Sequence, residues 1–183
     1  MDFEDIAKTL QEAPLPTSGT KPEVWCRVEV TEAAKEKNPF DEYDDINFTL
    51  RIVGSAVDAN GNKAFGFVWD RFSMPPKGHN MYWKTQKAKD ALGILLAPAL
   101  PRKERFDAAV VIAREAGGFE SVIVGKTALV QLRTNDGTDR KTGEIKSPAR
   151  HEKPRTEIGS WMPDTPDNCQ KQGIVADDAA APF

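Results

Sequence analysis

The residue types best suited to binding chemistry are aromatic rings with cations beside them. Trp25 is followed two positions later by Arg27, and Tyr82, Trp83 and Lys84 are consecutive. An exposed ring can stack on a planar heterocycle while a neighbouring cation neutralises a phosphate, so this group indicates a surface for a polyanion. For any one ring, a role in covering the hydrophobic core is an equally good interpretation.

The net charge of −3 conceals an uneven distribution along the 183 residues. Residues 1–62 carry 6 Lys and Arg against 13 Asp and Glu, residues 63–155 carry 18 against 10, and residues 156–183 carry 1 against 5. A basic middle between acidic ends predicts that the middle holds a polyanion. The acidic C-terminal end would either stay away from that surface or compete for it.

A cationic stretch that contains glycines surrounds residue 140. Gly137 and Gly143 indicate a flexible loop, and its basic side chains favour contact with phosphates. A charged loop that is merely solvated is the alternative. The loop cations predicted to contact a polyanion are Arg140, Lys141, Lys146, Arg150 and Lys153.

Two patterns that suggest catalysis fail on inspection. Gly125, Lys126 and Thr127 end like a phosphate-binding loop, but Glu120 stands where that loop needs a glycine. The carboxylates of residues 41–45 could hold a cation, yet no second acidic cluster is suggested elsewhere. With two distant cysteines and two histidines, neither a disulfide nor a zinc site is indicated. We expect no enzyme, no metal and no cofactor; a metal-dependent nuclease is the less favoured alternative.

The elements that must position these residues follow from the periodicity of the apolar residues. Alternating apolar residues predict strands, and apolar residues three or four positions apart predict helices. Pro98 and Pro101 end the first helix. The predicted strands are 24–30, 46–52, 65–72, 127–133 and 156–161, and the predicted helices are 82–97 and 103–115.

The Asn60-Gly61 pair is a strong hairpin signal, because both residues can adopt positive φ. A two-residue turn there places Ile52 opposite Trp69 and Arg51 opposite Asp70. A slip of one residue would exchange the two faces, and that alternative stays open. The favoured register puts Phe65, Phe67 and Trp69 in the core, and Val68, Asp70 and Phe72 on the outer face.

Three strands, a helical segment and two further strands form the element order of the OB-fold, a five-stranded barrel. We therefore expect a mainly β protein with helices inserted between strands 3 and 4. The predicted organisation is an N-terminal extension at residues 1–20, the OB-fold domain at 21–163, and a disordered acidic tail at 164–183.

The last seven residues begin with two acids and end in Pro-Phe. They resemble the C-terminal tip of bacterial and phage single-stranded DNA-binding proteins, although three alanines stand where those tips carry more acidic and aliphatic residues. The resemblance implies that the terminal ring enters an apolar pocket of a partner protein while a basic residue holds the α-carboxylate. An arbitrary chain end is the alternative. The implied partner-binding residues are Asp177, Asp178, Pro182 and Phe183.

These features predict a protein that looks like the phage branch of that group and binds single-stranded DNA without strong sequence preference. It would act in DNA replication, recombination and repair, and recruit the proteins of those processes through its tail. The alternative is a recombination accessory protein that delivers a partner. Besides the loop cations, the residues predicted to bind DNA are Trp25, Arg27, Arg51, Phe72, Lys77, Tyr82, Trp83, Lys84, Lys87 and Arg133.

The location follows from two absences in the sequence. No apolar run approaches the roughly twenty residues that a bilayer requires, and the acidic start from Met1 to Asp5 is unlike a secretory signal. We expect a cytoplasmic protein, in the host cytoplasm if it is viral, with no membrane contact. Its oligomeric state stays open, with a homo-oligomer as one option.

Overall fold

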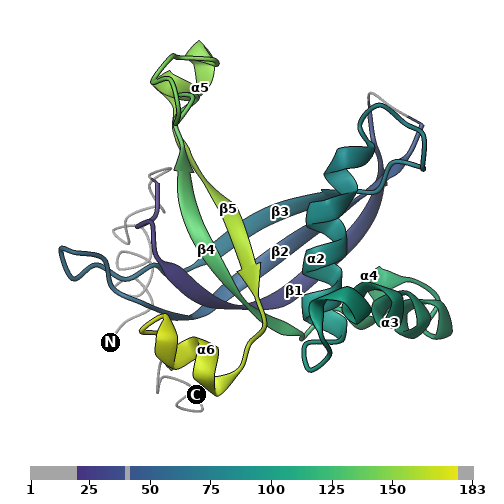
Figure 1. The fold of residues 1–183 in the computed structure, drawn as a ribbon. Coiled ribbons are helices and arrows are strands. Elements are labelled where there is room, and N and C mark those ends of the chain that lie inside the picture. Colours follow the sequence, from purple (N-terminus) through teal and green to yellow (C-terminus); the bar gives the residue numbers. More distant parts are fainter. Residues whose placement is uncertain (1–19, 40–41, 177–183) are drawn as a thin grey trace, which may run out of the picture. The chain divides into compact units, whose positions relative to one another are not determined.

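The protein is mainly β, and its computed structural model describes residues 20–39 and 42–176. Five strands form one open antiparallel sheet in the order β3-β2-β1-β4-β5 (Figure 1). Of the described residues, 21–134 and 156–176 form one compact unit and 135–155 form a second. The five strands are β1 (Trp25–Lys37), β2 (Asp44–Ser55), β3 (Phe67–Ser73), β4 (Thr127–Asn135) and β5 (Arg155–Met162).

Alternating apolar residues build the inner face of the sheet, as the sequence predicts. On β1 the side chains of Cys26, Val28 and Val30 are fully buried, whereas Trp25 and Arg27 stay partly exposed. Burial raises the pKa of the Cys26 thiol to about 11. The thiol therefore remains protonated at neutral pH and packs as a small apolar group.

The predicted register of the β2–β3 hairpin is wrong. Thr49 lies opposite Trp69 and Arg51 lies opposite Phe67, which shifts the strands by three residues from the predicted pairing. An odd shift exchanges the two faces of a strand. The side chain of Phe72 is consequently 1% exposed and packs against Phe48, with 4.6 Å between ring centroids.

The connection between β2 and β3 explains this shift. The Asp58 carboxylate accepts the backbone N–H groups of Asn60 and Asn62, at 2.8 Å each, and so closes a wider turn than a two-residue hairpin. Gly61 and Gly66 take positive φ values of 81° and 84°, a conformation that side chains with a Cβ rarely adopt. Residues 56–66 connect β2 to β3, and the pair of the two strands nearest the turn is Arg51 with Phe67.

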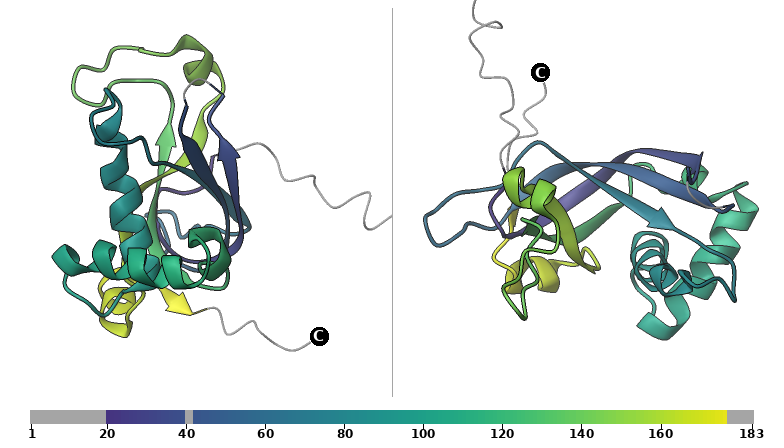
Figure 2. Two further views of the ribbon diagram at one scale, coloured as in Figure 1. Left: turned by 90° about the vertical axis from the view of Figure 1, so that its right-hand side faces the viewer. Right: turned by 90° about the horizontal axis from the view of Figure 1, so that it is seen from above.

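The predicted helices are confirmed, and two of them pack on each other beside the strands (Figures 1 and 2). The first buries Ala88 and Leu92 in the core. Gly93 permits the close crossing of the second, because a Cβ there would lie 2.7 Å from Arg105 Cβ. The helical segment consists of the short 3-10 helix η1 (Tyr82–Lys84), α2 (Thr85–Leu96), α3 (Arg102–Glu115) and α4 (Phe119–Val122).

The prediction of disorder from residue 164 is wrong for residues 164–176, which fold onto the sheet. They contain α6 (Pro166–Lys171) and β6 (Val175–Ala176), and β6 pairs with the end of β2. Ile174 is 8% exposed, and its side chain approaches Gly54 so closely that an added Cβ would lie 3.3 Å away. Residues 177–183 and most of the predicted N-terminal extension lie outside the described residues.

The second unit, residues 135–155, has more local structure than the predicted flexible loop. Thr138 and Ile145 form a β-bridge, and α5 (Pro148–Glu152) follows it. The carboxylates of Asp136 and Asp139 accept backbone N–H groups within the unit, at 2.9 Å from Thr138 and 2.8 Å from Lys141. Such bonds stabilise tight turns.

Candidate nucleic-acid interface

Three aromatic side chains point away from the core: Phe65, two residues before β3, and Phe67 and Trp69, at the start of β3. The exposed fractions of Phe65, Phe67 and Trp69 are 79%, 43% and 68%. Between them on the strand, Val68 points inward and is buried. We call Phe65, Phe67 and Trp69 the aromatic row. Exposed rings in sequence along a strand offer flat apolar surface to planar ligands.

Cations accompany the aromatic row. The Lys21 ammonium lies 5.8 Å from the ring centroid of Phe65 and donates to the Phe65 carbonyl at 2.8 Å. Arg51 lies opposite Phe67 in the register, and its guanidinium forms a 2.8 Å ion pair with Glu29. Arg71 follows two residues after Trp69 and is exposed, but its guanidinium donates to Asn47 at 3.0 Å and lies 3.6 Å from the buried Asp45 carboxylate. The cations closest to the row are therefore Lys21, beside Phe65, and Arg51, opposite Phe67.

Asp70 faces the other way from its neighbours on β3 and anchors α2. The Lys87 ammonium donates to it at 2.8 Å, and the Asp70 side chain is 10% exposed. Burial raises the pKa of Asp70 above its ordinary value, although Lys87, the Arg71 backbone N–H and Trp161 act to lower it. The ion pair holds the start of α2 against the strand that bears the aromatic row.

A second group of ring and cation lies in η1. Trp83 is 69% exposed, and the Lys84 ammonium lies 5.9 Å from its ring centroid. Tyr82 is half-buried, with the Lys89 ammonium 5.4 Å from its ring centroid. Lys77 is exposed a few residues earlier in the chain. These predicted residues therefore lie at the surface, as a binding role requires.

Arg27 is at the surface of the sheet but is occupied by a carboxylate. Its Nε lies 2.7 Å from Asp164 Oδ2, and Thr127 donates to the same oxygen at 2.6 Å. Burial acts to raise the pKa of Asp164, but the hydrogen bonds from Thr127 and Arg27 and the charge of Arg27 outweigh it, so the pKa is lowered. Arg27 therefore holds the C-terminal segment on the sheet.

Trp25 and Arg133 lie together on the β1–β4 part of the outer face. Trp25 is half-buried and lies opposite Gln131 in the register. Arg133 donates to the side-chain oxygen of Gln131 at 3.1 Å and lies over Gly159, where an added Cβ would meet its side chain. Of the predicted residues on the sheet, Phe72 is the one that the structure removes from the surface, because it is in the core.

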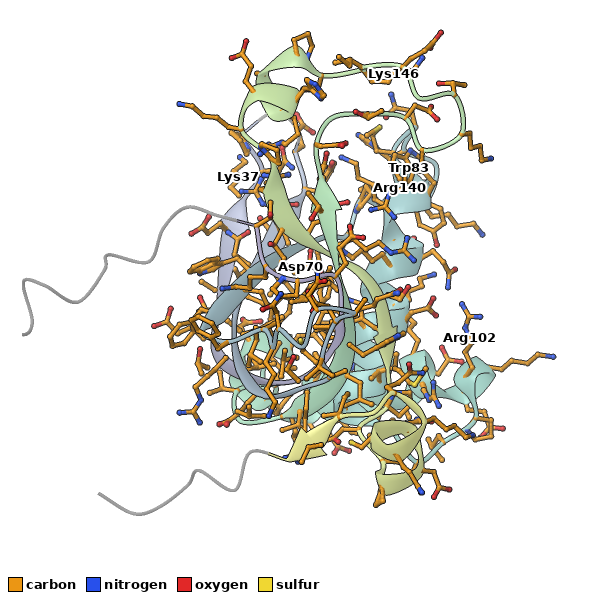
Figure 3. All side chains as sticks on the ribbon, turned by 90° about the vertical axis from the view of Figure 1, so that its left-hand side faces the viewer. Lys37, Asp70, Trp83, Arg102, Arg140 and Lys146 are labelled. Carbon is orange, nitrogen blue, oxygen red and sulfur yellow. The ribbon has the colours of Figure 1, made fainter. Side chains whose placement is uncertain are left out.

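The predicted loop cations belong to the unit of residues 135–155. Lys146 pairs with Glu144 at 2.7 Å, and both side chains are well exposed. Arg150 is half-buried. Figure 3 labels Arg140 and Lys146. The exposed predicted cations of this unit are Arg140, Lys141, Lys146 and Lys153.

The sequence misses the aromatic row because Phe67, Trp69, Val68 and Phe72 make both faces of the strand equally apolar. Periodicity alone cannot assign such a strand. The signal that could have found the row is Asp58, since Asp side chains commonly accept backbone N–H groups two residues on and so widen a turn. A wider turn changes the pairing of β2 with β3 and so the face on which each ring lies.

The described residues contain no group of three or more His, Cys, Asp or Glu side chains that could hold a metal ion. Of the acidic residues 41–45, Asp44 and Asp45 begin β2: Asp44 pairs with Lys35 at 3.1 Å, and the buried Asp45 accepts from Asn38 at 3.0 Å. Asp41 and the predicted partner-binding residues 177–183 lie outside the described part of the chain. No helix in the described ranges has the length and apolar character needed to cross a membrane.

No family model matches the chain, and comparison with curated proteins finds no match. The functional argument therefore depends on the geometry of the aromatic row and its cations.

Proposed function

We propose that the protein binds single-stranded DNA on the outer face of β2 and β3. The observation that carries this proposal is the aromatic row, in which Phe65, Phe67 and Trp69 are exposed beside Lys21 and Arg51. Stacking of a base on an aromatic side chain contributes about 1–3 kcal/mol and tolerates any base, because every base has a flat face.

The fold supports the proposal. The strand order β3-β2-β1-β4-β5, with helices between β3 and β4, is the order of the OB-fold, in which the face of strands 2 and 3 commonly binds oligonucleotides. The sheet is open, with β3 and β5 as its two ends, and Phe72 on β3 and Trp161 on β5 approach each other with 5.5 Å between ring centroids. An OB-fold interpretation therefore places the aromatic row on the expected ligand side.

Single strands are favoured over duplex DNA on physical grounds. Rings can stack only on bases that are unpaired and turned outward, whereas the bases of a duplex stack on one another. The exposed rings of Phe67 and Trp69 also belong to a strand rather than to a helix that could enter a major groove.

The wider role remains part of the proposal. A protein of this kind would coat single strands in the cytoplasm during phage DNA replication, recombination and repair. Recruitment of partner proteins through Asp177, Asp178, Pro182 and Phe183 rests on the sequence resemblance alone, because these residues lie outside the described range.

The test is titration of labelled oligo(dT) with the purified protein and its Phe67→Ala and Trp69→Ala variants. Each variant should lose about 1–3 kcal/mol of binding free energy. Val111→Ala on α3 is the matched control, since Val111 is also exposed, at 52%, but lies away from the aromatic row. Thermal melting should be unchanged in all three variants, because the replaced side chains are outside the core.

The same titration against duplex DNA at several salt concentrations decides the substrate class. Binding should weaken as salt rises, because counterions are released from the phosphates. Equal or tighter binding to duplex at every salt concentration would overturn the proposal. Shortening of the oligonucleotide after Mg²⁺ is added would point instead to a nuclease.

A further inference from the structure

A cleft of about 950 Å³ lies between α2, α3 and the end of β5, within the unit that carries the sheet. We call it the helix cleft. Phe106 and Trp161 contribute ring surface to its lining, and both are partly exposed. Its basic lining residues are Lys87, Lys89, Arg102, Lys103 and Arg105.

Positive charge predominates in the helix cleft. Its acidic lining residues are Asp90 and Asp107, and Asp90 is already paired with Arg102 at 2.8 Å. The Lys103 side chain forms no hydrogen bond or ion pair with any described residue and is exposed in the first turn of α3. The cleft thus offers unneutralised cations together with apolar ring surface, which is suited to phosphates joined to planar groups.

The helix cleft is joined to the aromatic row through Lys87. This residue lines the cleft, and its ammonium donates to Asp70, which directly follows Trp69 on β3. One helical turn before Lys87, the exposed Trp83 begins the same helical segment with Lys84 beside it. Figure 3 labels Asp70, Trp83 and Arg102, of which Trp83 comes just before α2 and Arg102 is the first residue of α3. A chain that stacks on Trp69 and crosses the edge of β3 therefore passes Lys87, which is paired with Asp70, and reaches the cleft that Lys87 lines.

We propose that the helix cleft is a second contact site for the same DNA strand, where its cations bind the phosphate backbone after the strand crosses the edge of β3. This inference rests on the proposed function of the aromatic row. A nucleic acid is favoured over an acidic peptide of a partner protein because a strand held on the row carries its own next phosphates to the helix cleft at high local concentration. A partner's peptide has no such tether.

The experiment uses the charge reversal Lys103→Glu in the full chain. Lys103 is chosen because its side chain has no partner among the described residues, so the fold should tolerate the change. Arg114→Glu is the matched control: Arg114 is exposed in the last turn of the same helix, it does not line the cleft, and its reversal alters the net charge equally. Thermal melting of both variants verifies that they fold.

Binding is measured with oligo(dT) of two lengths: about 6 nucleotides, near the lower end of the roughly 4–16 that one OB-fold covers, and about 20, which exceeds that range. Lys103→Glu should weaken binding of the longer strand roughly fivefold to tenfold and reduce its salt slope by about 0.7, the value for one phosphate contact on a single strand. Binding of the shorter strand should stay unchanged, because the aromatic row alone can hold it. Arg114→Glu should alter neither.

The outcomes separate this inference from the proposed function. If the unaltered protein binds neither oligonucleotide, the proposed function fails. If it binds both, and Lys103→Glu binds the longer strand as tightly as the unaltered protein does, the helix cleft is not a DNA site. Equal weakening of both lengths, or by both variants, would show a long-range charge effect and overturn the inference. A synthetic peptide of residues 177–183 tests the alternative occupant. If Lys103→Glu binds the longer strand normally, and the peptide protects the cleft from hydrogen exchange without displacing DNA, the cleft binds a peptide and the inference is overturned.

Discussion

The outer face of the sheet has a covered half and an open half, and each contains an arginine paired with a carboxylate. In the covered half, Arg27 meets Asp164 at 2.7 Å beneath residues 164–176, with 38% and 12% of the two side chains exposed. In the open half, Arg51 meets Glu29 at 2.8 Å, with 53% and 31% of the two side chains exposed beside Phe67. The two pairs have nearly the same length and the same chemistry, but the carboxylate of the second is the more exposed and the easier to exchange for a phosphate.

The difference shows that exposure, rather than charge, distinguishes the two pairs as candidates for phosphate binding. An exposed ion pair contributes about 0–1 kcal/mol, so an arriving phosphate can replace Glu29 at little cost. A carboxylate that is largely buried and holds three hydrogen-bond donors cannot be replaced so easily, because losing its partner leaves a desolvated charge. Arg27 therefore has a structural role, although it stands on the predicted binding face.

The largest expected effect tests whether residues 164–176, the segment over the covered half, stabilise the fold. Ile174→Ala should destabilise the protein by about 2–5 kcal/mol, because it removes a buried aliphatic side chain from the segment that lies on the sheet. Val175→Ala is the matched control, since Val175 is the next residue and is 65% exposed, and its change should be within about 0.5 kcal/mol. Urea unfolding measures both. Equal small effects would show that residues 164–176 contribute nothing to the fold.

The next effect separates the two arginines. Arg27→Ala should cost about 1–3 kcal/mol of unfolding free energy, because Asp164 loses a charged donor. Arg51→Ala should cost less than about 1 kcal/mol and should instead lower the affinity for oligo(dT) and reduce the salt slope by about 0.7. Urea unfolding and salt titration of the two variants provide the test. A larger loss of DNA affinity in Arg27→Ala than in Arg51→Ala would reverse the assignment of the two halves.

The sequence predicts those parts of the fold in which one face is clearly apolar. Cys26, Val28 and Val30 alternate with polar or amphipathic residues, and α2 repeats Ala88 and Leu92 at helical spacing, so both elements are found where expected. Hydrophobic periodicity is strong there because one side of each element meets water.

Two parts of the fold, the register of β3 and the C-terminal segment, could not be predicted from hydrophobic periodicity. The register of β3 depends on the turn that Asp58 closes, since apolar residues occupy both faces of the strand. The C-terminal segment buries few apolar side chains, so its composition resembles that of a disordered tail. Thr165 followed by Pro166 is a helix-start signal that would have pointed to α6, and the Thr165 hydroxyl does accept the Asn168 N–H at 3.2 Å.

The smallest effect concerns two carboxylates whose pKa values are shifted in opposite directions. Asp164, in the covered half, has a lowered pKa: burial alone would raise it, but hydrogen bonds from Thr127 and Arg27 outweigh burial. Asp70, beside the open half, has a raised pKa because its burial outweighs the attraction of Lys87. Because a shifted pKa links protonation to folding, the contributions of the two residues to the free energy of unfolding should depend on pH in opposite directions.

The sign follows from which state binds the proton more tightly. The carboxylate of Asp164 binds a proton more tightly in the unfolded chain than in the folded protein. Its contribution to the free energy of unfolding is therefore complete above the ordinary carboxylate pKa of about 3.9 and is lost as pH falls through the lower folded pKa. For Asp70 the folded protein binds the proton more tightly, so that contribution is complete below about 3.9 and is lost as pH rises through the higher folded pKa. Urea unfolding of the unaltered protein, Asp164→Asn and Asp70→Asn between about pH 3 and 6 measures both. The stability advantage over Asp164→Asn should shrink toward acid, whereas the advantage over Asp70→Asn should shrink toward neutral pH. Parallel curves for the two variants would mean that the covered carboxylate is no better stabilised in its charged form than the one at the open edge.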